Sequence, residues 1–153
     1  MEVKNLDIDA KEYLFGSLFL LANKLQILGD NYLEEITLKQ WFLLMMIENL
    51  DRKQSSITEV AAHIGSSRQN VRKMLEILEA KGYVKLSQNL HDKRNLSVEL
   101  TPQSFQFFEN FEAKGAIFLD RLFQDISSEQ MDISRKTFET LFENIKRMEL
   151  YNE

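Results

Sequence analysis

Hydrophobic residues recur at helical spacing near the N-terminus of this chain. Five leucines alternate at intervals of four and three residues, the spacing of an amphipathic helix whose apolar seam packs on another helix. These residues are Leu14, Leu18, Leu21, Leu25 and Leu28. Phe15, Phe19 and Ala22 add a second apolar stripe beside the first. We therefore predict a helix over about residues 9–29 that is shared with a partner chain; the alternative is a helix fully buried in the core of one chain.

Two short polar signals in the middle of the chain predict a pair of closely joined helices. Ser56 is followed three residues later by Glu59, and Ser66 is followed in the same way by Gln69. This spacing is typical of a capping box, in which each side chain satisfies a backbone group at the start of a helix. Gly65 supplies the left-handed residue that ends the first helix. Two capped helices joined by a few residues form a helix-turn-helix.

The second of these helices, predicted to run to Lys81, has one apolar and one polar face. The apolar face consists of Val71, Met74, Leu75 and Leu78. The polar face near the N-terminus consists of Arg68, Gln69, Asn70, Arg72 and Lys73. Because Arg pairs with guanine, and Gln or Asn with adenine, this face has the chemistry to read the major groove of DNA.

A β-hairpin is predicted directly after this helix. Residues 83–87 and 96–100 alternate between apolar and polar side chains, as half-buried strands do. The residues between them are polar and include His, Asp, Lys and Arg, which favours a long hairpin tip. A helix-turn-helix followed by a hairpin is a winged helix, in which the helix enters the major groove and the basic tip reaches the adjacent minor groove or backbone.

Helices are predicted again in the C-terminal third, where eight of the eleven Phe residues lie. Thr101 followed by Pro102 indicates one helix start, and Ser127 with Gln130 indicates another. The last helix carries an apolar stripe of Phe138, Leu141, Phe142, Ile145 and Met148. The fold class is therefore mainly α with a small β-hairpin wing. We predict a winged helix over residues 37–101, and a dimerisation region formed by residues 1–36 and 102–153.

The charge is distributed unevenly along the chain. The net charge of -5 hides a basic segment, residues 52–94, with nine Lys and Arg against four acidic residues, while the remainder carries -10. A basic middle between acidic ends is typical of a DNA-contacting module on an acidic body, and chance clustering on a solvated surface is the alternative.

Composition excludes several other classes of protein. The 153 residues include no Cys, which rules out a thiol nucleophile, a disulfide scaffold and a zinc-thiolate site. The longest near-apolar run, residues 13–22, is half the ~20 residues of a bilayer span, so we expect a cytoplasmic protein without a membrane partner. No enzyme motif is present. His63 and His91 are interpreted as surface residues, and no metal or cofactor is expected.

The order of these elements, together with the segment from Asp92 to Thr101, resembles the MarR family of transcriptional regulators. The family's wing signature is D-x-R, five residues, then L-T, and Asp92, Arg94, Leu100 and Thr101 match it. The resemblance implies a homodimer that binds double-stranded DNA at a pseudo-palindromic operator, usually as a repressor. It places the recognition helix at Ser66, Ser67, Arg68, Gln69, Asn70, Arg72 and Lys73. It places the wing contacts at Asp92, Lys93 and Arg94, with Arg94 entering the minor groove and Asp92 holding the wing in shape.

The resemblance also implies an effector, because many family members release DNA when a small lipophilic or aromatic molecule binds. A ligand pocket near Trp41 and Phe15 is one interpretation of the aromatic residues, and a dimer core is the other. For the dimer we expect Leu14, Leu18, Leu21, Leu25, Phe138, Leu141, Phe142 and Ile145. The alternatives to a repressor are a winged-helix module that binds another protein, and an activator without ligand control.

Overall fold

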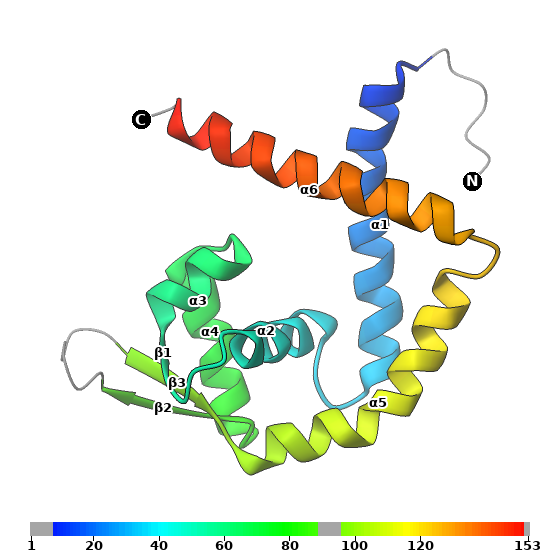
Figure 1. Ribbon diagram of the computed structural model, residues 1–153. Coiled ribbons are helices and arrows are strands. Elements are labelled where there is room, and N and C mark those ends of the chain that lie inside the picture. Colours follow the sequence, from blue (N-terminus) through cyan, green and yellow to red (C-terminus); the bar gives the residue numbers. More distant parts are fainter. Residues whose placement is uncertain (1–7, 89–95, 152–153) are drawn as a thin grey trace. The chain divides into compact units, whose positions relative to one another are not determined.

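Six helices and three short strands make up the part of the chain that the computed structural model describes, residues 8–88 and 96–151 (Figure 1). In chain order they are α1 (Ala10–Leu33), α2 (Leu38–Asn49), β1 (Ser55–Ser56), α3 (Ile57–Ile64), α4 (Arg68–Ala80), β2 (Val84–Gln88), β3 (Leu96–Leu100), α5 (Pro102–Leu122) and α6 (Ser128–Leu150). The predicted fold class is confirmed. The chain divides into two compact units, Met1–Phe107 and Phe108–Glu153.

The sheet of the first unit is antiparallel, with strand order β1-β3-β2. β2 and β3 pair from Val84 opposite Leu100 to Gln88 opposite Leu96, which confirms the predicted hairpin, although β2 begins one residue later than predicted. β1 adds Ser55 opposite Val98 on the other edge of β3. A strand of two residues has no alternation to detect, and for this reason the sequence did not predict it.

The core of the first unit lies between α2, α3, α4 and the sheet. Its fully buried apolar side chains are Leu43 and Leu44 from α2, Val60 from α3, Val71, Leu75 and Leu78 from α4, and Val98 from β3. The apolar face predicted for the helix now labelled α4 is thus the face that enters this core, apart from Met74, which is half-buried. The polar face of the same helix therefore points away from the core.

α1 ends four residues later than predicted, because Gly29 does not end it. Gly29 is buried, and a Cβ atom on it would lie 2.8 Å from the Leu38 side chain at the start of α2. The glycine therefore permits the close approach of α1 and α2 rather than a helix stop. At the next residue, Asp30 Oδ1 accepts a hydrogen bond of 2.6 Å from the backbone N–H of Leu38. This bond satisfies a donor at the start of α2 and ties α2 to the end of α1.

The start signals of the two C-terminal helices are confirmed. α5 begins at Pro102, directly after Thr101, as predicted, although the Thr101 hydroxyl donates to the Gly82 and Tyr83 carbonyls and does not cap the helix. α6 has Ser127 as its N-cap, and Ser127 and Gln130 form the full capping box, in which Ser127 Oγ accepts from the Gln130 N–H at 3.2 Å. Both signals are local in sequence, which explains why they could be read without knowledge of the tertiary structure.

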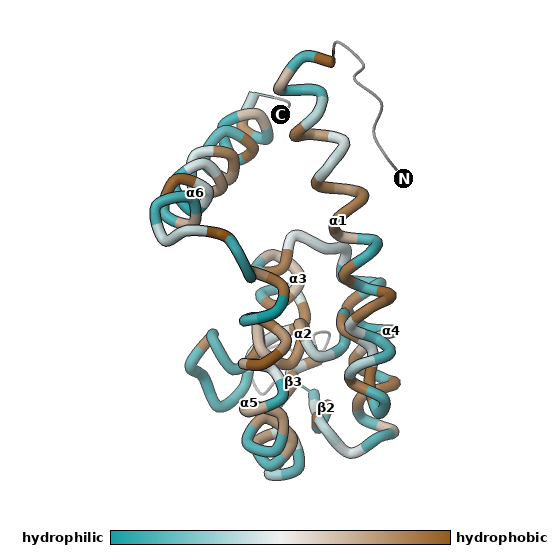
Figure 2. Tube along the Cα trace, turned by 90° about the vertical axis from the view of Figure 1, so that its right-hand side faces the viewer, coloured by the Kyte–Doolittle hydropathy of each residue, from teal (hydrophilic) through white to brown (hydrophobic). Residues whose placement is uncertain are grey.

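The apolar stripe of α1 is exposed along most of its length within the single chain. Leu14, Leu18 and Leu21 are 57, 38 and 54% exposed, and only Leu25 is half-buried. The alternative of a helix buried in the core of one chain is therefore wrong. Figure 2 shows hydrophobic residues at intervals along this helix. Among the described residues, no helix has the length and apolar character needed to cross a bilayer.

Candidate nucleic-acid interface

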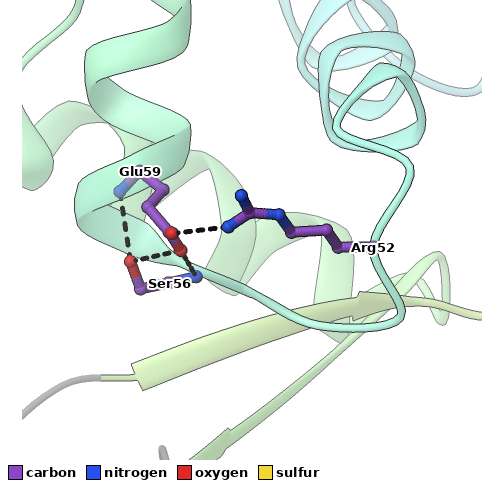
Figure 3. Close-up of polar contacts among 3 residues, drawn as sticks. All are labelled: Arg52, Ser56 and Glu59. Carbon is purple, nitrogen blue, oxygen red and sulfur yellow. Dashed lines mark hydrogen bonds and ion pairs between the residues drawn. The ribbon is translucent and has the colours of Figure 1, made fainter.

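The start of α3 is fixed by a compact set of polar contacts (Figure 3). Ser56 and Glu59 form the predicted capping box: Glu59 accepts from the Ser56 backbone N–H at 2.9 Å, and Ser56 Oγ accepts from the Glu59 N–H at 3.2 Å. The Arg52 guanidinium adds an ion pair to the Glu59 carboxylate at 2.8 Å. These contacts hold α3 to the loop that precedes β1.

The same contacts lower the pKa of Glu59. The hydrogen bond from the Ser56 backbone N–H is the largest cause, followed by the one from the Ser56 side chain, while the Arg52 charge adds a smaller effect. The contacts favour the ionised carboxylate of the folded state. Their stabilisation is therefore present at neutral pH, and it is lost as the pH falls through the lowered pKa.

The turn between α3 and α4 places the second cap one residue later than predicted. Gly65 is left-handed, with φ 63°, and its N–H donates to the Ala62 carbonyl. The Ser66 N–H donates to the Ala61 carbonyl at 3.0 Å, so Ser66 closes the end of α3. Ser67 is consequently the N-cap of α4, and its side chain accepts from the Asn70 N–H at 3.2 Å. The predicted Ser66–Gln69 cap is wrong.

This register gives a direct test of the cap. We expect Ser67→Ala to lower the free energy of unfolding by about 1 kcal/mol, because a backbone donor at the start of α4 loses its acceptor. The matched control is Ser66→Ala, which keeps the backbone bond to Ala61 and is expected to cost less. Urea unfolding of the parent and both variants measures the difference. A larger loss in Ser66→Ala than in Ser67→Ala would contradict the observed register.

α4 presents a polar and basic surface over its N-terminal half. The exposed predicted contact residues are Ser67, Arg68, Gln69, Asn70, Arg72 and Lys73, and Ser66 is half-buried. Their exposure follows from the burial of Val71 and Leu75 on the opposite face. The structure therefore brings the predicted residues from the N-cap Ser67 to Lys73 to the N-terminal end of α4, with positive charge and amide groups side by side, whereas Ser66 lies in the turn before it.

One arginine of this surface also has a partner on α4. Arg72 Nε lies 2.9 Å from Glu76 Oε1, one turn further along the helix. The pair is more than half exposed at both side chains, and such a surface pair contributes at most about 1 kcal/mol. An incoming phosphate could therefore displace Glu76 from Arg72 at small cost.

The wing is described at its base. β2 and β3 are the two strands of the hairpin. The predicted wing contacts Asp92, Lys93 and Arg94 lie outside the described residues. At the other end of the signature, Thr101 Oγ1 donates to the Gly82 carbonyl at 2.7 Å. This bond holds the end of the hairpin against the turn that follows α4.

A junction at the base of α4 was not predicted from the sequence. The Tyr83 hydroxyl donates to Glu35 Oε2 at 2.6 Å, and Lys81 Nζ donates to the Glu35 carbonyl oxygen at 2.6 Å. Glu35 lies in the loop after α1, so these bonds join residues more than 45 positions apart. No local pattern links such residues, and only the packed fold reveals them.

The junction raises the pKa of Tyr83 from 10.0 to about 12, chiefly through burial of the phenol and then through the hydrogen bond to Glu35 and its charge. A raised pKa in the folded state favours the neutral phenol, so its stabilisation is complete below pH 10 and is lost as the pH rises towards 12. We therefore expect one of the four tyrosines to ionise late in an absorbance titration, and Tyr83→Phe to remove that late phase. A late phase that persists in Tyr83→Phe would contradict the assignment.

A cavity of about 430 Å³ lies elsewhere in the first unit, and it does not coincide with the predicted ligand pocket. It is lined by Ile47, Glu48, Asp51, Arg52, Lys53, Glu99, Leu100 and Phe105. Trp41 and Phe15 are not among these residues. Phe15 is 65% exposed and its ring packs edge-on against Phe19, with centroids 5.1 Å apart. His63 is exposed on α3, and the described residues contain no cluster of three or more potential metal ligands.

Comparison with known proteins shows which proteins this chain resembles. A family model described as the MarR family matches residues 35–95. The HTH-type transcriptional repressor YetL of Bacillus subtilis is 26% identical over 143 residues, which cover 92% of this chain and 85% of YetL. The HTH-type transcriptional regulator YfiV of the same organism is 28% identical over 96 residues, 63% of this chain and 59% of YfiV, so the match spans less than two thirds of that relative.

The fold also matches solved structures. A mutant MarR from E. coli, crystallised with operator DNA, superposes with a TM-score of 0.75 at 21% identity, covering 84% of this chain and 92% of that one. The agreement confirms the winged helix-turn-helix fold.

Proposed function

We propose that the chain is a transcriptional regulator of the MarR type, which binds double-stranded DNA as a homodimer and represses transcription; the match of residues 35–95 to the MarR family model and the likeness to YetL support this. The observation that carries the proposal is the exposed N-terminal half of α4, with its arginines, amides and lysine opposite a face buried in the core. Members of the family are regulators rather than enzymes. We also propose a cytoplasmic location for such a regulator.

The chemistry of α4 supports base recognition. Arg68 and Asn70 lie at the exposed start of the helix, where a recognition helix contacts base edges. A bidentate contact from either would discriminate between bases by roughly 1–3 kcal/mol. Lys73 and Arg72 lie one turn further along and are assigned to the phosphate backbone. Arg94 is assigned to the minor groove beside the wing.

The homodimer is supported by the exposed apolar residues of α1 and α6. The proposed contacts are Leu14, Leu18, Leu21 and Leu25 on α1, and Phe138, Leu141, Phe142 and Ile145 on α6. A two-fold dimer presents two recognition helices, so the operator is expected to be an inverted repeat with half-sites about one helical turn, ~34 Å, apart. Occupancy of a promoter by such a dimer blocks polymerase without another partner, which favours repression.

Selection of bound duplexes from a random DNA pool tests the proposal. We expect enrichment of an inverted repeat by the parent, and weaker enrichment by Arg94→Ala run in parallel. If the parent forms a dimer but enriches no sequence, the protein-interaction module becomes the better interpretation. A bound effector in the purified protein would also prevent enrichment. Solvent extraction of the protein, followed by mass spectrometry of the extract, checks for such a molecule.

We also propose control by a small lipophilic or aromatic effector, on the basis of the family. A thermal-shift screen of hydrophobic and phenolic compounds, followed by operator-binding assays with each hit, tests this part separately. A compound that raises the melting temperature and weakens operator binding would support it. If no compound changes the melting temperature or the operator affinity, the proposed control by an effector is contradicted. The DNA-binding proposal would then stand without ligand control.

A further inference from the structure

The turn between α4 and β2 is held from two sides within the first unit. On one side, Lys81 and Tyr83 donate to the backbone and side chain of Glu35 in the loop after α1. This loop has a defined shape, because Glu34 has a left-handed φ of 58° and Ile36 is only 3% exposed. The C-terminal end of α4 is therefore tied to the C-terminal end of α1.

On the other side, the same turn is held by the start of α5. Gln103 Nε2 donates to the Lys81 carbonyl at 3.1 Å, and Ser104 Oγ donates to the Tyr83 carbonyl. The Tyr83 ring also packs edge-on against Phe107, with centroids 5.4 Å apart. Gly82 has φ +83°, a backbone conformation that L side chains rarely adopt, so the turn needs a glycine at this position.

We propose that Glu35 and Tyr83 are positioning residues, which fix the direction of α4 relative to α1 and α5 and so the separation of the two recognition helices in the dimer. The inference rests on the proposed function, because α1 and α5 belong to the proposed dimerisation region. Neither residue is assigned a contact with DNA, so both act through α4.

Because α4 is long, a small change in its direction displaces its N-terminal end by a large distance. The helix has 13 residues, so it is about 20 Å long. A tilt of about 10° about its anchored C-terminal end would move its N-terminal end by about 3.4 Å, which is the rise of one base pair. A small change at the Glu35–Tyr83 bond is therefore amplified into a change of one base pair in the preferred position of each half-site.

Two substitutions separate the bond from the packing around it. Tyr83→Phe keeps the ring against Phe107 and removes only the hydroxyl that donates to Glu35. Glu35→Gln keeps a side-chain oxygen that can accept from Tyr83, and it leaves the backbone carbonyl that accepts from Lys81. Glu35→Gln is thus the conservative control.

The first measurement is binding to a panel of operators whose half-site spacing is the selected one, or one or two base pairs shorter or longer, because a two-fold dimer applies the same shift to both half-sites. We expect Tyr83→Phe to weaken binding at the selected spacing by between about two- and tenfold, the range for loss of one hydrogen bond, and to narrow the differences between spacings. Glu35→Gln is expected to keep the spacing preference of the parent. If Tyr83→Phe lost the same factor in affinity at every spacing, the hydroxyl would only stabilise the fold, and the inference would be overturned. Unchanged affinity at every spacing would overturn it as well.

The second measurement needs no DNA. The chain contains no Cys, so Gln69→Cys at the exposed N-terminal end of α4, the end that a tilt would move, provides a single site for a spin label in each protomer. We expect one narrow inter-protomer distance in the otherwise unchanged protein, and a shifted or broader distribution when Tyr83→Phe is added. Identical distributions would overturn the positioning role. Absence of any inter-protomer distance in the labelled parent would instead show that no dimer forms, which overturns the proposed function and this inference with it.

Discussion

Lys73→Glu is expected to weaken operator binding by about 100-fold or more at moderate salt. Lys73 is exposed on α4, one turn after the N-terminal residues assigned to bases. Reversal of its charge replaces an attraction to phosphate by a repulsion, and the two-fold dimer contains the change twice. Each phosphate contact contributes about 0.9 to the slope of log affinity against log salt, so the slope should fall by about 2. Fluorescence anisotropy with a labelled operator over a salt series measures both quantities.

The matched control is Lys136→Glu on α6. Lys136 is exposed, and the substitution changes the net charge by the same amount in a different unit of the chain. Lys136→Glu is expected to change operator affinity only slightly, through the net charge of the protein. Equal losses in Lys73→Glu and Lys136→Glu would show that net charge, rather than the surface of α4, determines binding. Arg94→Glu is expected to lose DNA binding in the same way as Lys73→Glu, while all three variants remain dimeric.

The parts of the fold that could be predicted depend on signals within a few residues of one another. The Ser56–Glu59 and Ser127–Gln130 capping boxes, the left-handed Gly65 and the alternation of residues 96–100 each appear where the sequence indicated. Each signal reflects a backbone group that a nearby side chain satisfies, or the two-residue period of a strand. The exposed polar face of α4 follows from the same local periodicity.

The parts that could not be predicted depend on neighbours distant in sequence. The predicted end of the first helix, at residue 29, is four residues too early, because only the packed Leu38 side chain shows that Gly29 lies inside α1. The second cap moved from Ser66 to Ser67, because the Schellman ending of α3 uses the first serine. The bond between Glu35 and Tyr83 has no sequence signature at all, although it fixes the end of the helix that carries the candidate site.

Phe142→Glu is expected to shift the protein from dimer to monomer. Phe142 is 70% exposed within the single chain, and Phe138, Leu141 and Ile145 on the same stripe of α6 are 40–51% exposed. Burial of side chains of this size stabilises by about 1.5–3 kcal/mol each, which gives a reason for two copies to cover them. Because a two-fold interface contains every residue twice, one substitution places two unpaired carboxylates in it, each with a desolvation cost of several kcal/mol.

Sedimentation equilibrium of the parent, Phe142→Glu and Thr140→Glu measures this effect. Thr140 is exposed on the side of α6 away from the apolar stripe, where its hydroxyl donates to the Lys136 carbonyl, so a carboxylate there remains in water and the dimer is expected to persist. The monomeric variant should also lose operator affinity while α4 is unchanged, because a single winged helix contacts only one half-site. A dimeric Phe142→Glu would place the interface on another surface, and monomeric Thr140→Glu would show that any added charge on α6 disrupts assembly.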